Sequence, residues 1–197
     1  MKIRSVANML LGLMIAAGAT AVPALADSPA NPGHAAVWQP YDILVHLTGL
    51  PRPYSCNELW YKFRGVLVNL GAGRIDEVTP TDCSGTSPDV HVRFVLPRLV
   101  EGAAAAHEDI QADERSIELA PGKPAHLAAS DCHLVREISE SLLTDLPLKV
   151  TSAQFDCGSD AAQSTRTSSH SAPADERYAV QIQALMPVWP GVPAAPG

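Results

Sequence analysis

Hydrophobic residues recur along the chain with two periods, and these periods appear twice in the same order. After Cys56 the hydrophobic residues follow the 3.6-residue period of an amphipathic helix, which stops at Gly71. After Cys132 a second helical pattern runs to Pro147. The hydrophobic positions of the two patterns are Leu59, Phe63, Val66, Leu67 and Leu70, then Val135, Leu142, Leu143 and Leu146. We expect one helix in each region.

Strand-like alternation of hydrophobic and polar residues surrounds each helical pattern at equivalent places. One strand precedes each helix and two follow it, the first ending at an Asp-Cys pair and the second at Pro97 or Pro187. The alternating positions are Ile43, Val45, Leu47, Val90, Val92, Phe94 and Leu96 in the first copy, and Ile117, Leu119, Tyr178, Val180, Ile182, Ala184 and Met186 in the second. Each copy is therefore predicted to be a β-α-β-β unit.

Two such units in tandem predict an α+β fold built by internal duplication. In split β-α-β folds of the ferredoxin-like kind the first strand lies beside the third. We therefore expect a ferredoxin-like duplication, with two helices packed on one face of a mainly antiparallel sheet. The expected boundaries are a flexible arm at 27–40, the first unit at 41–100, a connection at 101–115, the second unit at 116–187 with a flexible loop at 158–176, and a proline-rich tail at 188–197. Because the chain is divided between two copies, each hydrophobic core is expected to be small.

Helix start signals agree with these boundaries. Ser55, with Glu58 three residues later, has the pattern of a capping box before the first helix. Ser130 or Asp131 is expected to cap the second helix, because short polar side chains accept hydrogen bonds from the free N–H groups of a first turn.

The first 26 residues have the pattern of a secretory signal. Lys2 and Arg4 precede an apolar run from Met9 to Ala17, and Ala24-Leu25-Ala26 forms a cleavage site of small residues. No cysteine follows this site to carry a lipid. We expect export to a bacterial periplasm as a soluble mature protein of about 171 residues. The alternative is an N-terminal membrane anchor that stays uncleaved, although the apolar run is short for a span.

Charge and motifs narrow the class of function. The formal net charge is −7, and without the signal the chain has 12 Lys and Arg against 21 Asp and Glu, or about −9. This balance argues against a nucleic-acid-binding protein, which carries a basic patch. The sequence contains no G-x-S-x-G, H-E-x-x-H or glycine-rich phosphate loop. We therefore expect a protein that is not an enzyme and needs no cofactor.

Four cysteines, Cys56, Cys83, Cys132 and Cys157, all lie after the signal. An even number in an oxidising compartment predicts two disulfides, for which three pairings exist. A helix of about 15 residues and a returning strand of about seven have similar lengths, which brings the cysteine before each helix level with the one after the strand. We predict Cys56–Cys83 and Cys132–Cys157; the alternative joins the two copies, for example through Cys56–Cys132.

The two copies differ on the outer face of their helices. In the first helix Trp60, Tyr61, Arg64 and Val68 lie at the flank of the core face or opposite it, and Trp60 can stack with Arg64. The positions equivalent to Tyr61, Arg64 and Val68 in the second helix are Glu137, Glu140 and Thr144. Because Trp, Tyr and Arg dominate binding energy at interfaces, we predict an interaction patch for a protein partner or a second copy. The alternative is that the arm, the connection or the tail covers these residues.

Two histidines suggest a second site. If the hydrophobic residues of the strands face the helices, His46 and His91 point to the outer face, on strands that are expected to be neighbours. Two imidazoles with a third ligand from a loop suit copper or zinc. The alternative is an ordinary polar sheet face in contact with water.

These observations together predict an exported, disulfide-stabilised periplasmic binding or protein-interaction module without catalytic activity. It acts through the first helix, and it neither binds nucleic acid nor is embedded in a membrane. The alternative function is a periplasmic copper or zinc binding protein that uses His46 and His91.

Overall fold

A computed structural model describes residues 34–100, 110–158 and 177–188 of the chain. The expected signal at 1–26 lies outside the described residues, as do residues 27–33 of the arm, the first nine residues of the connection, residues 159–176 of the loop and residues 189–197 of the tail.

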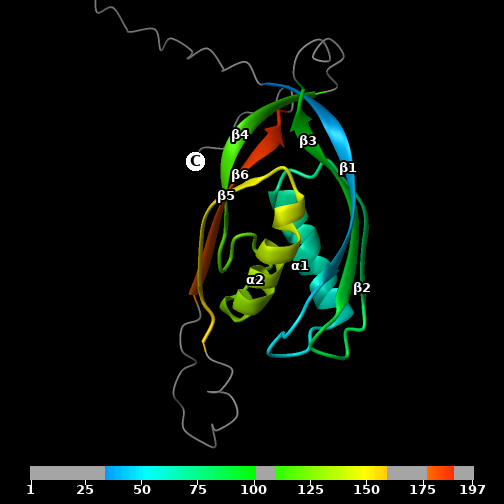
Figure 1. The fold of residues 1–197 in the computed structure, drawn as a ribbon, viewed down its shortest axis with the longest axis vertical. Helices are drawn as coiled ribbons and strands as arrows, with labels where there is room; N and C mark the ends of the chain where they lie inside the picture. Colours follow the sequence, from blue (N-terminus) through cyan, green and yellow to red (C-terminus); the bar gives the residue numbers. More distant parts are fainter. Residues whose placement is uncertain (1–33, 101–109, 159–176, 189–197) are drawn as a thin grey trace, which may run out of the picture. The chain divides into compact units, whose positions relative to one another are not determined.

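Six strands and two α-helices follow one another in the order predicted from the hydrophobic pattern. The elements are β1 His34–His46, α1 Cys56–Asn69, β2 Arg74–Thr81, β3 Asp89–Leu99, β4 Ile110–Leu119, α2 Cys132–Ser141, β5 Lys149–Asp156 and β6 Arg177–Pro187. The strands form one sheet in the order β2-β3-β1-β4-β6-β5, and every pair of neighbours is antiparallel (Figure 1). The predicted α+β class is confirmed.

The two halves of the sheet have the same arrangement of strands. In each half the first strand lies beside the third, since β1 pairs with β3 and β4 pairs with β6. The halves meet where β1 pairs with β4, over the short stretch from His34 to Ala36. The element order is β-α-β-β twice, which differs from the β-α-β-β-α-β order of a ferredoxin-like fold. The ferredoxin-like form of the duplication is therefore not shown.

Two strands begin earlier than the alternation predicts. β1 starts at His34, inside the predicted arm, and β4 starts at Ile110, inside the predicted connection. The buried residues in these early parts are Ala36 and Ala112, both fully buried at the junction of the two halves. Alanine contributes little to a hydrophobic pattern, and its small side chain suits a closely packed junction. This is why the alternation missed both strand starts.

Pro187 ends β6 as predicted, but Pro97 does not end β3. β3 continues through Pro97 to Leu99, and β1 contains Pro40. β2 pairs with β3 only as far as Val95, and β4 pairs with β1 only as far as Ala36. Each proline therefore lies where one side of its strand has no neighbouring strand, so its missing N–H need not interrupt a ladder.

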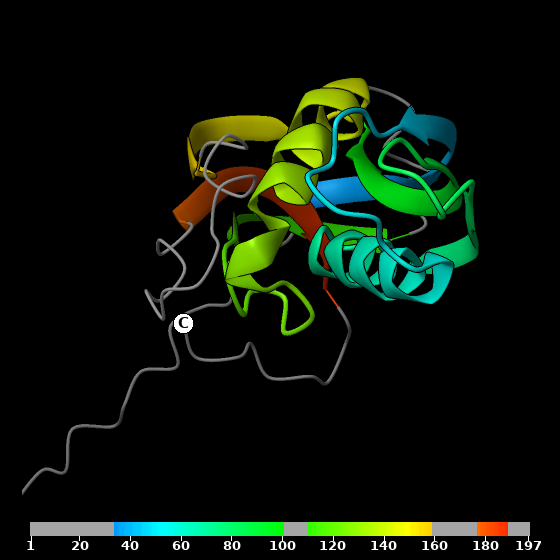
Figure 2. The ribbon, with the colours of Figure 1, turned by 90° about the horizontal axis from the view of Figure 1, so that it is seen from below.

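A single hydrophobic core serves both halves. The same cluster of buried residues includes Phe63 of α1, Ile138 of α2, Phe94 of β3 and Val180 of β6. Both helices lie in the hollow of the curved sheet (Figures 1 and 2). The expectation of two small cores was wrong, because the pairing of β1 with β4 makes the sheet continuous and merges the two buried faces.

The helix starts differ in how they are capped. The Ser55 Oγ accepts from the Glu58 N–H at 3.1 Å, as predicted, but the Glu58 carboxylate binds Arg52. Asp131 precedes α2 without making a side-chain cap, because its carboxylate is engaged elsewhere. The second helical pattern is also shorter than expected, since α2 ends at Ser141 and a 3₁₀ turn follows at Leu143–Asp145.

Both disulfides have the predicted pairing, Cys56–Cys83 and Cys132–Cys157, with Cα atoms 5.4 and 5.3 Å apart. Each joins the first residue of a helix to the end of the hairpin strand that returns beside it. Disulfides form and persist in oxidising compartments, so they suggest an extracytoplasmic location. Within the described parts of the chain, no helix is long and apolar enough to cross a membrane.

Removal of the second disulfide by Cys132→Ala with Cys157→Ala is expected to lower the free energy of unfolding by about 3.5 kcal/mol, because the open chain regains the entropy of a loop of 25 residues. Urea unfolding followed by far-UV circular dichroism measures the change. The matched variant without Cys56 and Cys83 is expected to lose a similar amount. A loss under about 1 kcal/mol in either variant would contradict this loop-entropy account.

Candidate functional site

The four residues of the predicted patch lie together on one side of α1. Tyr61 is 48% exposed and Val68 is 55% exposed, whereas Trp60 is half-buried. The Trp60 and Tyr61 rings are perpendicular with centroids 4.8 Å apart, and the Arg64 guanidinium lies 5.4 Å from the Trp60 ring. The predicted stacking of Arg64 on Trp60 is therefore present, and the patch is an ordered surface.

The patch forms one wall of a groove. A hollow of about 510 Å³ lies between the patch and a second wall made of Pro124, Ala125, His126 and Met186. A smaller hollow of about 390 Å³ shares Tyr61 and His126 with the first and extends to the start of α1, where Ser55, Asn57, Glu58 and Lys62 line it. We call the two hollows together the α1 groove. It is apolar near the end of α1 and polar near its start.

A buried ion pair holds the second wall against α1. The Lys62 Nζ lies 2.6 Å from Asp131 Oδ2 and donates to the His126 carbonyl at 3.1 Å. Asp131 is fully buried, and its Oδ2 also accepts from the Ala128 N–H at 2.7 Å. One lysine of the first half therefore fixes both ends of the segment from His126 to Asp131 in the second half.

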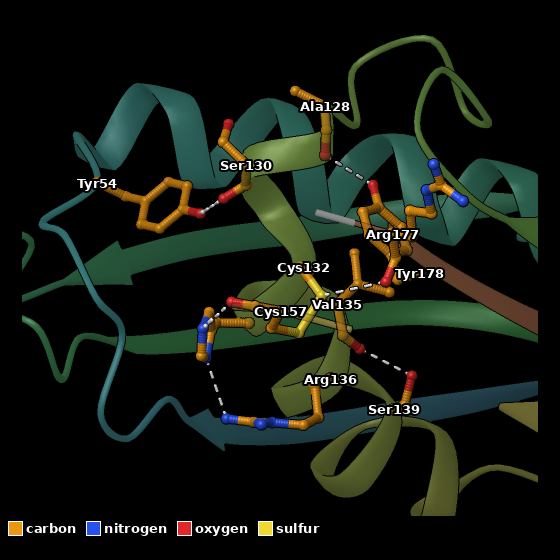
Figure 3. Close-up of a disulfide and its surroundings, with 11 residues drawn as sticks. Tyr54, Ala128, Ser130, Cys132, Val135, Arg136, Ser139, Cys157, Arg177 and Tyr178 are labelled. Atoms are coloured by element: carbon orange, nitrogen blue, oxygen red, sulfur yellow. Dashed lines mark hydrogen bonds between the residues drawn. A yellow bond between two sulfur atoms is a disulfide. The ribbon is translucent and has the colours of Figure 1, made fainter. Parts of the chain in front are cut away.

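Two tyrosines fix the same segment from its two sides (Figure 3). The Tyr54 hydroxyl donates to Asp131 Oδ1 at 3.1 Å and lies 3.4 Å from the Ser130 carbonyl. The Tyr178 hydroxyl of β6 donates to the Ala128 carbonyl at 2.9 Å. Burial raises the pKa of both hydroxyls, and the nearby Asp131 carboxylate raises it further. Both tyrosines therefore stay protonated and keep donating.

Arg52 completes the charge balance of this network. Its guanidinium lies 3.9 Å above the Tyr54 ring, 2.9 Å from Glu58 Oε1 and 3.7 Å from Asp131 Oδ1. The hydrogen bond from Arg52 lowers the pKa of the Glu58 carboxyl. Two cations, including Lys62, thus face two carboxylates. Among the described residues, no buried side-chain nitrogen or oxygen is without a hydrogen-bond partner.

Sequence reasoning found the α1 wall and missed the rest of the groove. Lys62 carried one usable signal: it is three residues after Leu59, so a charged side chain lies only about 60° from the centre of the buried helix face. A charge at such a position needs a buried partner. Nothing in the sequence pattern identified that partner as Asp131, or placed Pro124 and His126 opposite the patch.

The two predicted metal ligands lie on the outer sheet face, on the neighbouring strands β1 and β3, but bind different carboxylates. The His46 Nδ1 lies 2.8 Å from Asp89, directly opposite in the ladder, and the His91 Nε2 lies 2.5 Å from Asp42. In the part of the chain that the structure describes, no group of three or more His, Cys, Asp or Glu is arranged to hold a metal ion. The two imidazoles do not converge on a shared partner.

His91 belongs to a chain of charges across three strands. Its Nδ1 lies 3.4 Å from Glu77, whose carboxylate also accepts from Arg93. The hydrogen bond from Arg93 lowers the pKa of Glu77. The hydrogen bond with Asp42 is the main cause of the raised pKa of His91, and the bond with Glu77 raises this pKa further. The polar face is therefore a network of ion pairs across β1, β3 and β2.

Comparison of the chain with protein-family models, with curated proteins and with solved structures found no match. The geometry of the α1 groove is thus the main basis for a functional proposal.

Removal of one partner of the buried pair, by Asp131→Leu or Lys62→Met, is expected to lower the free energy of unfolding by about 3–5 kcal/mol, because the other charge stays buried and unpaired. The double variant is expected to lose less than the sum of the two single losses. Urea unfolding of all four proteins gives the coupling energy of the pair. Additive losses would show that Lys62 and Asp131 act independently.

The His91 network is expected to stabilise the fold more at acid than at alkaline pH. Because the pKa of His91 is raised in the folded protein, its contribution is complete below the ordinary histidine pKa of 6.5 and is lost as the pH rises through the folded value. Histidine NMR titration is expected to give His91 a midpoint above 6.5, and Asp42→Asn to lower that midpoint. An unchanged midpoint in Asp42→Asn would rule out this pairing in solution.

Proposed function

We propose that the protein is an exported, non-enzymatic module of the periplasm that binds a protein partner, or a second copy of itself, through the α1 groove. The observation that carries the proposal is the facing arrangement of an exposed aromatic and arginine wall with a second, apolar wall. The volume of the larger hollow, about 510 Å³, falls within the usual size of binding pockets.

The composition and rigidity of the groove support this proposal. Trp60, Tyr61 and Arg64 are of the residue types that contribute most to binding at interfaces. The second wall is held by Lys62 and Asp131 before any ligand arrives. A surface that is already ordered loses less conformational entropy on binding.

The second half lacks an equivalent surface on its helix. Glu137, the counterpart of Tyr61, accepts from the Thr48 N–H and hydroxyl at 3.2 Å and so serves as an internal contact. Glu140 and Thr144, the counterparts of Arg64 and Val68, are exposed polar residues. Two halves with the same order of elements and equivalent disulfides support an origin by duplication, after which only the first helix acquired a binding face.

Export is supported by the two disulfides and by the signal-like pattern of residues 1–26. The absence of hydrolase, zinc-protease and phosphate-loop motifs from the sequence supports a role without catalysis. The alternative of copper or zinc binding by His46 and His91 has less support, because each imidazole is already bonded to a carboxylate.

The double substitution Tyr61→Ala with Arg64→Ala is expected to reduce capture of a periplasmic partner, or self-association, at least tenfold while changing the melting temperature little, because Tyr61 and Arg64 are exposed. Affinity capture from periplasmic extract and analytical ultracentrifugation measure the two kinds of binding. Glu140→Ala with Thr144→Ala, on α2 and in the turn that follows it, is the control and is expected to bind normally. A large loss of melting temperature would show instead that the patch is part of the core.

A further inference from the structure

The segment that follows β6 has a regular spacing of prolines. Prolines occupy every third position at Pro187, Pro190, Pro193 and Pro196. A polyproline II helix has three residues per turn, so in that conformation this spacing would align Pro190, Pro193 and Pro196 along one face. The other residues between 188 and 197 are Val, Trp, Gly and Ala, and none is charged. The sequence of this segment thus has one continuous, uncharged proline face.

The last described residues of the chain lie at one end of the α1 groove. Gly71, just after α1, packs so closely on the end of β6 that a Cβ there would lie 2.8 Å from the Met186 sulfur and 3.6 Å from the Pro187 Cδ. Figure 2 shows the end of β6 beside the end of α1. Met186 itself lines the groove with Val68 and Asn69. Whatever follows Val188 therefore starts next to the groove.

The segment is long enough to span the groove. The lining residues on α1 run from Asn57 to Asn69, which is about 18 Å along a helix axis. Nine residues, 189–197, reach about 28 Å in a polyproline II helix. The last fixed contact is the hydrogen bond from the Val188 N–H to the Gln111 carbonyl at 2.8 Å. The difference of about 10 Å leaves enough chain to turn from β6 into the groove.

The lining of the groove suits a proline-rich ligand. Polyproline II segments bind in grooves lined by aromatic side chains, and the perpendicular rings of Trp60 and Tyr61 form such a lining opposite Pro124. A polyproline II backbone makes no internal hydrogen bonds, so its carbonyls are free to accept from donors such as Arg64. An uncharged segment also fits the apolar end of the groove, where it begins.

We infer that the α1 groove binds residues 189–197 of the same chain as a polyproline II helix, with Pro190, Pro193 and Pro196 against the α1 wall. The inference rests on the proposed function, because it assigns the same groove a tethered ligand. A short tether gives an effective concentration in the millimolar range, so a weak contact is sufficient. An external partner then has to displace the segment before it binds, which makes the segment an internal competitor.

The test compares the full chain with a version that ends at Val188, using ¹H–¹⁵N NMR of the Trp60 indole and the Gly65 amide. A synthetic peptide of residues 187–197 is expected to shift both signals in the shortened protein, to the positions that they already have in the full chain. The full chain is expected to bind the added peptide at least tenfold more weakly than the shortened protein, because its own segment occupies the groove.

Two controls make the result specific. A peptide of the same composition without the three-residue proline spacing, and the shortened protein with Tyr61→Ala, are each expected to reduce peptide binding at least tenfold. Equal binding of the regular and rearranged peptides overturns the inference, and so does equal binding of the peptide by the full and shortened chains. Full-chain signals that move with protein concentration also overturn it, because the segment then comes from a second copy.

The outcome is separable from that of the proposed function. If the peptide of residues 187–197 fails to bind the shortened protein while Tyr61→Ala with Arg64→Ala still abolishes partner capture, the inference fails and the proposed function stands. If the peptide binds and the double substitution leaves partner capture intact, the proposed function fails.

Discussion

The buried ion pair between Lys62 and Asp131 is the interaction on which the candidate site depends. A charge that leaves water is stabilised in a protein interior only when its counter-charge and its hydrogen-bond donors are in place. Lys62 comes from α1, and the groups that satisfy Asp131 come from both halves, through Tyr54 and the Ala128 N–H. The second wall of the α1 groove therefore exists only when both halves are folded and docked.

The residues of this network differ in type and role from the residues at the equivalent positions of the other half. Counted from the helix-starting cysteines, the counterpart of Lys62 is Ile138, which is fully buried, and the counterpart of Asp131 is Ser55, which caps α1. Those two residues have ordinary structural roles, in the core and at a helix start. Each half therefore supplies one charge to a contact that is not repeated at the equivalent positions of the other half.

The parts of the structure that sequence reasoning predicted are those determined locally. The helix and strand order, the disulfide pairing and the outer face of α1 follow from periodicity and from comparison of the two copies. Sequence reasoning missed what depends on contacts between distant segments: the early strands at Ala36 and Ala112, the single core, and the approach of His126 to α1. These contacts join residues about 60 or more positions apart, and no periodic pattern encodes which distant segment fills a space.

Both disulfides close loops within one half, and the paired cysteines are 27 and 25 positions apart in the sequence. Neither covalent link spans the junction of β1 with β4. In an oxidising compartment that the chain enters N-terminus first, the first pair of cysteines can therefore be oxidised before the third and fourth cysteines are present to compete. The order of the cysteines along the chain thus favours the observed pairing under that condition, because the first disulfide can form before the second half docks.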